Sequence, residues 1–214
     1  MNKIDFDAKA ALAHLRKADP TLGALIERAG PFAMELKKAP SVFAALCEVI
    51  VYQQLSNKAA ATIFGRLCAH FPRGVQSLTA ERLMVLSDAK VRACGISRPK
   101  LKGLRDLARR AARGEVPTLS KTRRMGDAEI AEALVAIHGI GRWSAEMFLM
   151  FRLGRPDVLP VDDYSLRKAY ARAFNKRKLP TPEALAKYGA RWAPYRTVAS
   201  WYLWRALDLP KAGN

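Results

Sequence analysis

The sequence predicts an all-α fold, and three observations lead to that prediction. Apolar residues recur at intervals of three and four positions along most of the chain, as they do on the buried face of an amphipathic helix. Prolines and glycines divide these segments from one another. No stretch alternates apolar and polar residues for long enough to form a sheet, and no internal repeat occurs. With 214 residues, 50% of them hydrophobic, the chain can bury a core as one domain or two small ones.

The first half of the chain contains several helical segments. Residues 1–40 are interrupted by prolines and glycines, and a helix then follows Ser41, a favourable N-cap, and ends in the polar sequence 52–56. Two or three short helices are expected between Thr79 and Gly114, and the last of them has a stripe of buried leucines. The opposite face of this helix carries Arg98, Lys100, Lys102, Arg105, Arg109, Arg110 and Arg113. Such a basic run indicates a solvated surface, part of which can contact the phosphates of a nucleic acid.

In the second half, two amphipathic helices flank the sequence His138-Gly139-Ile140-Gly141. Two glycines two positions apart allow the chain to reverse and another backbone to approach closely. We expect Ile140 to point inward and the second helix to begin near Arg142 or Trp143, where its first N–H groups can meet a phosphate. An ordinary helical corner is the alternative. Three further helices are expected after residue 163, and the last contains Trp201, Tyr202 and Trp204, a spacing that is more typical of a core than of a binding site.

Composition limits the partners of the chain. There are 37 Lys and Arg against 19 Asp and Glu, so the net charge of +18 favours a polyanion such as nucleic acid. Cys47, Cys68 and Cys94 show no metal-binding spacing, so we expect neither a zinc site nor an iron–sulfur cluster. The sequence shows no export signal and no run long enough to span a bilayer, so we expect a cytoplasmic protein, associated with the nucleoid in a bacterium, with reduced thiols and no membrane partner.

The segment from 134 to 164 combines the glycine corner, a proline-containing connection and adjacent aspartates. It reads Leu134-x-x-Ile137-x-Gly139-Ile140-Gly141-x-Trp143-Ser144-Ala145-Glu146, and later Asp157-Val158-Leu159-Pro160-Val161-Asp162-Asp163-Tyr164. This resembles the helix-hairpin-helix and Gly-Pro-Asp segment of a DNA glycosylase superfamily, in the form of DNA-3-methyladenine glycosylase II. Further blocks resemble that family in the same order: Gln53-Gln54-Leu55-Ser56, Cys94-Gly95-Ile96-Ser97-x-x-Lys100, Arg191-Trp192-x-Pro194-Tyr195-Arg196 and Trp201-Tyr202-Leu203-Trp204.

The resemblance implies two helical subdomains with an active cleft between them. Residues 43–160 would form a barrel-like domain with the helix-hairpin-helix at 130–151, and 1–42 would join 161–214 as the second domain. It also implies a monomer that binds double-stranded DNA containing a damaged base. Contacts with that DNA would come from Gln54, which would wedge into the duplex, and from Gly139, Gly141, Arg142 and Ser144. A structural monovalent or divalent cation, bound together with DNA, would contact the backbone carbonyls of Val135, Ile137 and Ile140.

A carboxylate would perform the chemistry. Breaking an N-glycosidic bond builds positive charge on the deoxyribose, which an anion beneath C1′ stabilises. In the methyladenine-type pattern the acid directly precedes the residue that opens the next helix, which selects Asp163. Counting back from Arg167, as in relatives of the endonuclease III type, would instead select Asp162. We favour Asp163, with Asp162 as a helix cap or a supporting carboxylate, while capping of the helix by both is the purely structural alternative.

The residue at 143 indicates the reaction subtype. Relatives that also cleave the strand carry a lysine nucleophile here, whereas this chain has Trp143. A base pocket of Trp143, Tyr52 and Trp201 or Tyr202 would favour cationic alkylated purines through cation–π attraction. The sequence therefore predicts a monofunctional glycosylase for bases such as 3-methyladenine and 7-methylguanine, without a cofactor for catalysis. The alternatives are a glycosylase for uracil, hypoxanthine or oxidised purines, and a non-catalytic helix-hairpin-helix protein that binds damaged DNA.

Overall fold

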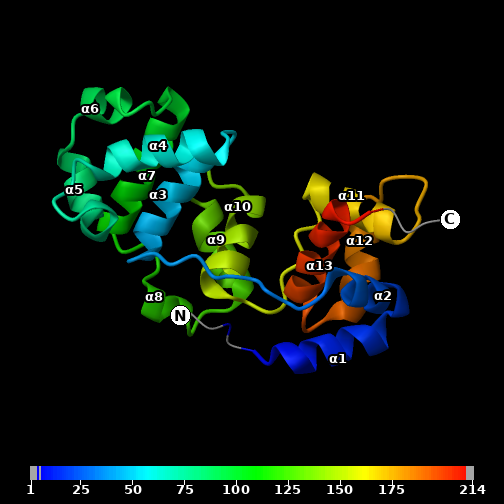
Figure 1. Ribbon diagram of the computed structural model, residues 1–214. Helices are drawn as coiled ribbons and strands as arrows, with labels where there is room; N and C mark the ends of the chain where they lie inside the picture. The colour runs from blue at the N-terminus through cyan, green and yellow to red at the C-terminus, as the bar shows by residue number, and fades with distance from the viewer. Residues whose placement is uncertain (1–3, 5, 211–214) are drawn as a thin grey trace. The chain divides into compact units, whose positions relative to one another are not determined.

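The computed structural model describes residues 4 and 6–210, and within that part the chain forms helices and turns without a strand. The all-α prediction is therefore confirmed. The chain divides into two compact units: unit 1 comprises the residues up to Lys37 and from Glu146 onward, and unit 2 comprises Lys38–Ala145. Figure 1 labels the helices of both units. In the part of the chain that the structure describes, no helix is both long and apolar enough to cross a bilayer.

Five helices of unit 2 begin after a serine or threonine whose side chain caps the helix. The side chains of Ser41, Ser56, Thr79, Ser87 and Thr118 each accept a hydrogen bond from the backbone N–H three residues further on. These bonds satisfy donors that a helix start leaves unpaired, which explains where the helices begin. The elements are α3 (Val42–Tyr52), α4 (Asn57–Cys68), η1 (Gly74–Ser77), α5 (Ala80–Val85), α6 (Asp88–Ala93), α7 (Arg98–Ala112), α8 (Leu119–Thr122), α9 (Asp127–Val135) and the start of α10 (Arg142–Phe148).

Helix α7 organises unit 2. It packs against α3, α5 and α6 (Figure 1). Its Leu104 and Leu107 side chains are completely buried. Its basic face is only partly a solvated surface, because Arg105 turns back and donates to the carbonyls of Leu83 and Leu86, at 2.5 Å each. These carbonyls lie at the end of α5, where the helix supplies no partner for them. Arg105 thus joins α7 to the end of a neighbouring helix.

Unit 1 is built around α13, whose apolar residues are buried almost all the way around the helix. In this unit, Asp19 connects α2 with Trp192 through hydrogen bonds. Its Oδ1 accepts the Leu22 N–H at the start of α2, and its Oδ2 accepts the indole N–H of Trp192 at 2.9 Å. The elements of the unit are α1 (Ala8–Ala18), α2 (Pro20–Ala29), the π-helical turn η2 (Leu149–Leu153), α11 (Tyr164–Ala173), α12 (Pro182–Gly189), η3 (Ala190–Trp192) and α13 (Arg196–Asp208).

The division between the units differs from the expected boundaries at 43 and 160. Residues 146–160, which we expected in the larger domain, belong by their contacts to unit 1. The Phe151 carbonyl accepts the Lys37 N–H at 2.8 Å, and the Val158 N–H donates to the Thr197 hydroxyl at 3.0 Å. Hydrogen bonds of this kind across long sequence distances leave no trace in local periodicity, so the sequence gives no sign of a division at residue 146.

Candidate functional site

The carboxylate of Asp163 is held at the start of α11. Its Oδ1 accepts the Leu166 N–H at 2.5 Å and the indole N–H of Trp204, on α13, at 3.2 Å. The residue is half-buried, and a helix N-terminus favours a negative charge at this position. Two donors from different helices fix the orientation of the carboxylate, so Asp163 is presented as an oriented anion.

Asp162 has a different environment. It is exposed and lies in the tight turn in which the Asp163 N–H donates to the Pro160 carbonyl at 3.0 Å. The cap of α11 is Asp163, so our expectation that Asp162 caps this helix is wrong. The turn itself explains the difference, because it brings the second aspartate, and not the first, over the N–H groups of the helix.

Trp204 is a residue that sequence reasoning did not place in the site. Its ring is half-buried beside Phe151, with centroids 6.1 Å apart, and its N–H reaches Asp163. The sequence offered a signal in the form of the aromatic cluster on the last helix. That cluster could not indicate which ring faces the carboxylate, because the contact joins residues 41 positions apart.

The structure places Trp201 and Tyr202 in the core of unit 1. Tyr202 is fully buried and its hydroxyl donates to the Gly30 carbonyl at 3.0 Å. Trp201 is 8% exposed and packs edge-on against Phe32, while the Arg205 guanidinium lies 5.0 Å from its ring centre. Tyr202 therefore offers no open ring face in this structure, and Trp201 offers very little.

The glycine corner in unit 2 forms the expected hairpin between α9 and α10. We call His138–Gly141 the hairpin loop. Gly139 has a φ of +84°, which favours glycine, and Ile140 is 3% exposed, so it points inward as predicted. Helix α10 begins at Arg142, also as predicted. Gly141 has no positive φ, and a Cβ added there would meet nothing within 4 Å, so the fold itself does not require glycine at this position.

Residues next to the hairpin loop differ in exposure. Trp143 is 46% exposed, Val135 is 45% exposed and Arg142 is also exposed, whereas Ser144 is 5% exposed. We expected Ser144 to contact DNA, but the burial of this residue leaves little side-chain surface for such a contact. The carbonyl of Ile137, one of the three expected to bind a cation, already accepts the Ile140 N–H at 3.0 Å.

The two glutamines after α3 have different environments. Gln54 is exposed and has a φ of +54°, while the side chain of Gln53 donates to the Gly139 carbonyl at 2.7 Å. Tyr52 is half-buried, and its ring lies 6.4 Å from that of Phe64. Within unit 2 the structure thus joins the segment after α3 to the hairpin loop. Among the described residues, no three His, Cys, Asp or Glu side chains are grouped to hold a metal ion.

Comparison with known proteins gives concordant results. A family model described as "HhH-GPD superfamily base excision DNA repair protein" matches residues 47–194. The chain is 36% identical to DNA-3-methyladenine glycosylase 1 of Schizosaccharomyces pombe over 92% of this chain and 86% of that protein.

Two solved structures are similar over most of the chain. One is the S. pombe 3-methyladenine DNA glycosylase in complex with abasic DNA, with a TM-score of 0.80 and 35% identity over 96% of this chain and 100% of that one. The other is a DNA-3-methyladenine glycosidase from Bacillus halodurans, with a TM-score of 0.83 and 35% identity over 92% and 88% of the two chains.

Proposed function

The chain belongs to the HhH-GPD superfamily of base excision DNA repair proteins, and we propose that it is a monofunctional DNA glycosylase. Its substrate would be double-stranded DNA that contains an alkylated purine of the 3-methyladenine or 7-methylguanine type. The products would be the free base and an abasic site. The names of the relatives support this substrate class, and the observation that carries the proposal is the oriented carboxylate of Asp163.

Asp163 would act on the sugar. Departure of the base leaves positive charge on the deoxyribose, and an anion held nearby stabilises that charge in the transition state. Because Leu166 and Trp204 both donate to Oδ1, the carboxylate does not have to reorient when the charge develops. The same carboxylate can orient the water that attacks C1′. A cationic alkylated purine is a good leaving group, so a strong general acid is not needed.

The target base must first leave the stack, at a cost of a few kcal/mol that is smallest for a damaged pair. Trp143 and Tyr52 would stack on the extruded base, and Trp143 has the exposed surface for this role. Tyr202 is fully buried and Trp201 is 8% exposed, so neither ring presents a face on which a base could stack. A tryptophan at 143 has no amine to form a Schiff base, which supports a hydrolase without strand cleavage.

The hairpin would hold the strand next to the extruded nucleotide. Gly141 supports this role because no contact with the residues that the structure describes accounts for the absence of a side chain there, whereas close approach of a DNA backbone would. Arg142 is exposed at the start of α10 and can neutralise a phosphate. Gln54, exposed in its left-handed conformation, would fill the space that the base leaves.

A structural cation would bind at the same hairpin, coordinated by the carbonyls of Val135, Ile137 and Ile140. Val135 is the last residue of α9, so its carbonyl belongs to those that a helix end leaves without an intrahelical partner. Carbonyl oxygens suit a hard monovalent or divalent cation. The three carbonyls could therefore hold such an ion, and that of Ile137, which already accepts the Ile140 N–H, would use its second lone pair. The ion would supply positive charge for a DNA phosphate without taking part in the chemistry.

Replacing Asp163 with Asn tests the function. Asn also caps helices, so the fold should persist while the anion is lost. We expect the rate of 3-methyladenine release from methylated duplex DNA to fall by at least about a hundredfold. Asp162→Asn is the matched control, because this exposed neighbour does not cap α11, and it should keep the wild-type rate.

Full activity of Asp163→Asn would contradict the assignment of the acid. Binding of damaged DNA by the wild-type protein without release of any base would instead favour the non-catalytic alternative. A panel of duplexes containing uracil, hypoxanthine or oxidised purines would separate the other lesion classes. Borohydride added during turnover should trap no covalent complex, and a trapped adduct would contradict the monofunctional assignment.

A further inference from the structure

One face of α7 contacts both of the loops to which we assign DNA contacts. Lys100, Gly103 and Asp106 are spaced by three residues, so they lie along the same side of the helix. Their contacts are with the hairpin loop and with the segment after α3, which we call the glutamine loop (Gln53–Ser56). All of these residues belong to unit 2. The family motifs drew attention to Lys100, but the proposed chemistry does not use it.

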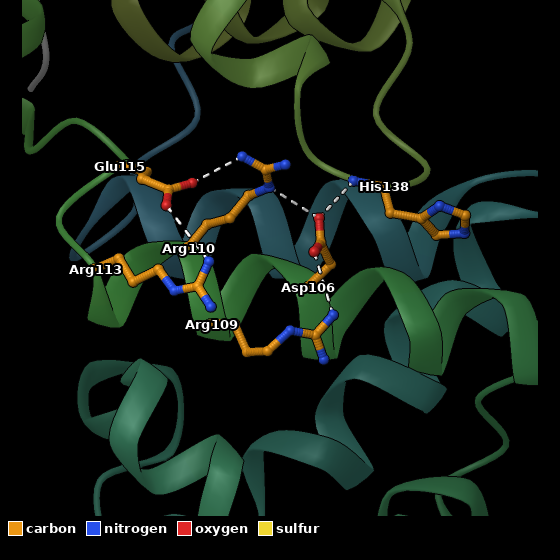
Figure 2. Close-up of polar contacts among 6 residues, drawn as sticks. All are labelled: Asp106, Arg109, Arg110, Arg113, Glu115 and His138. Carbon is orange, nitrogen blue, oxygen red and sulfur yellow. Dashed lines mark hydrogen bonds and ion pairs between the residues drawn. The ribbon is translucent and has the colours of Figure 1, made fainter.

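Asp106 holds the hairpin loop through its backbone. Its Oδ2 accepts the His138 N–H at 2.9 Å, and Figure 2 shows the His138 ring turned away from this contact. Arg110 donates to the same oxygen at 3.0 Å and Arg109 donates to Oδ1 at 3.2 Å. Arg110 also donates to Glu115 at 2.8 Å. Two guanidinium groups thus offset the negative charge of the Asp106 carboxylate. Its third hydrogen-bond donor is the backbone N–H of His138, the first residue of the hairpin loop.

Gly103 allows the hairpin loop to lie directly on α7. A Cβ at this position would come within 2.8 Å of the His138 carbonyl oxygen, a distance that real Cβ atoms essentially never show. The obstacle is a backbone atom and not the flexible end of a side chain. Asp106 therefore holds His138 through its backbone N–H, and Gly103 lets the C=O of the same residue lie against α7.

Lys100 and Gln53 extend this arrangement to the glutamine loop. The Lys100 ammonium donates to the carbonyls of Val51 and Gln53 at 2.8 and 2.7 Å, which closes the C-terminal end of α3. Gln53 then donates its side-chain N–H to the Gly139 carbonyl at 2.7 Å. The chain of contacts runs from α7 to the end of α3, across Gln53 to the hairpin loop, and back to α7.

We propose that Lys100, Gly103 and Asp106 form a positioning face that fixes the glutamine loop and the hairpin loop in one DNA-binding arrangement, with Gln53 as the direct link. The inference rests on the proposed function, since it assumes that these loops contact distorted DNA. Its functional consequence is preorganisation: Gln54 and the hairpin are already spaced for the distorted duplex, so binding it requires no ordering of the loops. Undamaged duplex, held mainly by charge, does not need this spacing.

A pair of glycine substitutions tests the role of α7 without removing any hydrogen bond. Gly103→Ala places a methyl group against the His138 carbonyl, whereas Gly65→Ala, on the exposed side of α4, adds one in open space. Alanine is the better helix former in both cases. We expect Gly65→Ala to raise the thermal midpoint and leave DNA binding unchanged. Gly103→Ala should weaken binding of a duplex with an abasic-site analogue by about tenfold or more.

Gln53→Ala and Lys100→Met test the link between the loops. Lys102→Met is the matched control for the second, because it removes the same charge from the exposed side of α7. The decisive measurement is the ratio of the dissociation constants for undamaged and abasic duplex at one salt concentration. We expect that ratio to fall about fivefold to tenfold for Gln53→Ala and Lys100→Met and to stay at the wild-type value for Lys102→Met.

A merely structural role predicts a different result, in which affinity for both duplexes falls together and follows the loss of thermal stability. That result, or an unchanged ratio in Gln53→Ala and Lys100→Met, would overturn the positioning role. Because the readout is binding, it can be measured even if the wild-type protein releases no alkylated base. Failure of the proposed enzymatic function and failure of this inference are therefore distinguishable.

Discussion

At the scale of single residues, the proposed chemistry depends on how one carboxylate is oriented. Asp163 caps α11, and on that basis alone it would be an ordinary capping residue. The additional donor is Trp204, which comes from another helix and has no part in the cap. A helix cap needs only the hydrogen bond from the backbone N–H, and this bond alone would let the carboxylate rotate. The hydrogen bond from Trp204 limits that rotation.

Trp204→Phe tests this orientation. The substitution keeps an aromatic ring beside Phe151 but removes the N–H that reaches Asp163. Loss of one hydrogen bond should cost about 1 kcal/mol of unfolding free energy, because the cap remains. The single-turnover rate of base release should fall by roughly tenfold, since small misplacements of a catalytic group are costly. A rate within twofold of the wild type, measured alongside thermal unfolding, would show that the cap alone orients Asp163.

Trp143→Ala tests the stacking surface. The ring is 46% exposed, so its removal should change the thermal midpoint little. Release of cationic 7-methylguanine should fall by at least about tenfold, because both stacking and cation–π attraction are lost. Trp143→Phe should retain part of the activity, since a smaller ring still stacks. Binding to undamaged duplex should be unchanged in both variants, and undiminished release by Trp143→Ala would refute the stacking role.

At the scale of elements, the sequence predicted what is encoded locally. Ser41 caps α3 as expected, and Ile140 points inward at a corner whose Gly139 takes a positive φ. These outcomes follow from short-range periodicity and from the conformational preferences of single residues. What the sequence could not predict lies at long range. Asp106 meets His138 across 32 residues and Trp204 meets Asp163 across 41, so no local pattern records either contact.

The contact between α7 and the hairpin loop should make the stability of the protein depend on pH. The pKa of Asp106 lies below its ordinary value of 3.8, chiefly because the His138 N–H donates to the carboxylate, with Arg110 and Arg109 adding to the effect against the opposing effect of burial. A carboxyl group whose pKa is lowered on folding stabilises the protein above its unfolded pKa, and this stabilisation is lost as the pH falls through the folded pKa.

We therefore expect Asp106→Asn to be less stable than the wild type at pH 6 to 7, by about 1 kcal/mol. The difference should shrink as the pH falls below about 4. Urea unfolding of both proteins across this range measures it. A difference that is constant with pH would indicate that the charge of Asp106 does not contribute, whereas the Arg109 and Arg110 contacts require that it does.

At the scale of the whole molecule, the charge surplus exceeds what internal ion pairs can neutralise. Several arginines are paired, including Arg196 with Asp157 and Arg110 with Glu115. Even if every one of the 19 acidic residues paired with a base, the net charge of +18 would remain. A charge of this size attracts any duplex, damaged or not, so it accounts for encounter with DNA but not for selection of a lesion.

Salt should separate these two contributions. Raising the salt concentration from about 50 to about 200 mM should weaken binding of undamaged duplex by roughly a hundredfold, the loss expected for about four phosphate contacts. The stacking proposed for Trp143 and the wedging proposed for Gln54 would involve no counterion release, so the preference for abasic over undamaged duplex should stay nearly constant. Arg142→Gln should lower the slope of log affinity against log salt by about one unit. If the preference itself disappeared at high salt, lesion selection would depend on charge, and the neutral contacts proposed for Trp143 and Gln54 could not be its source.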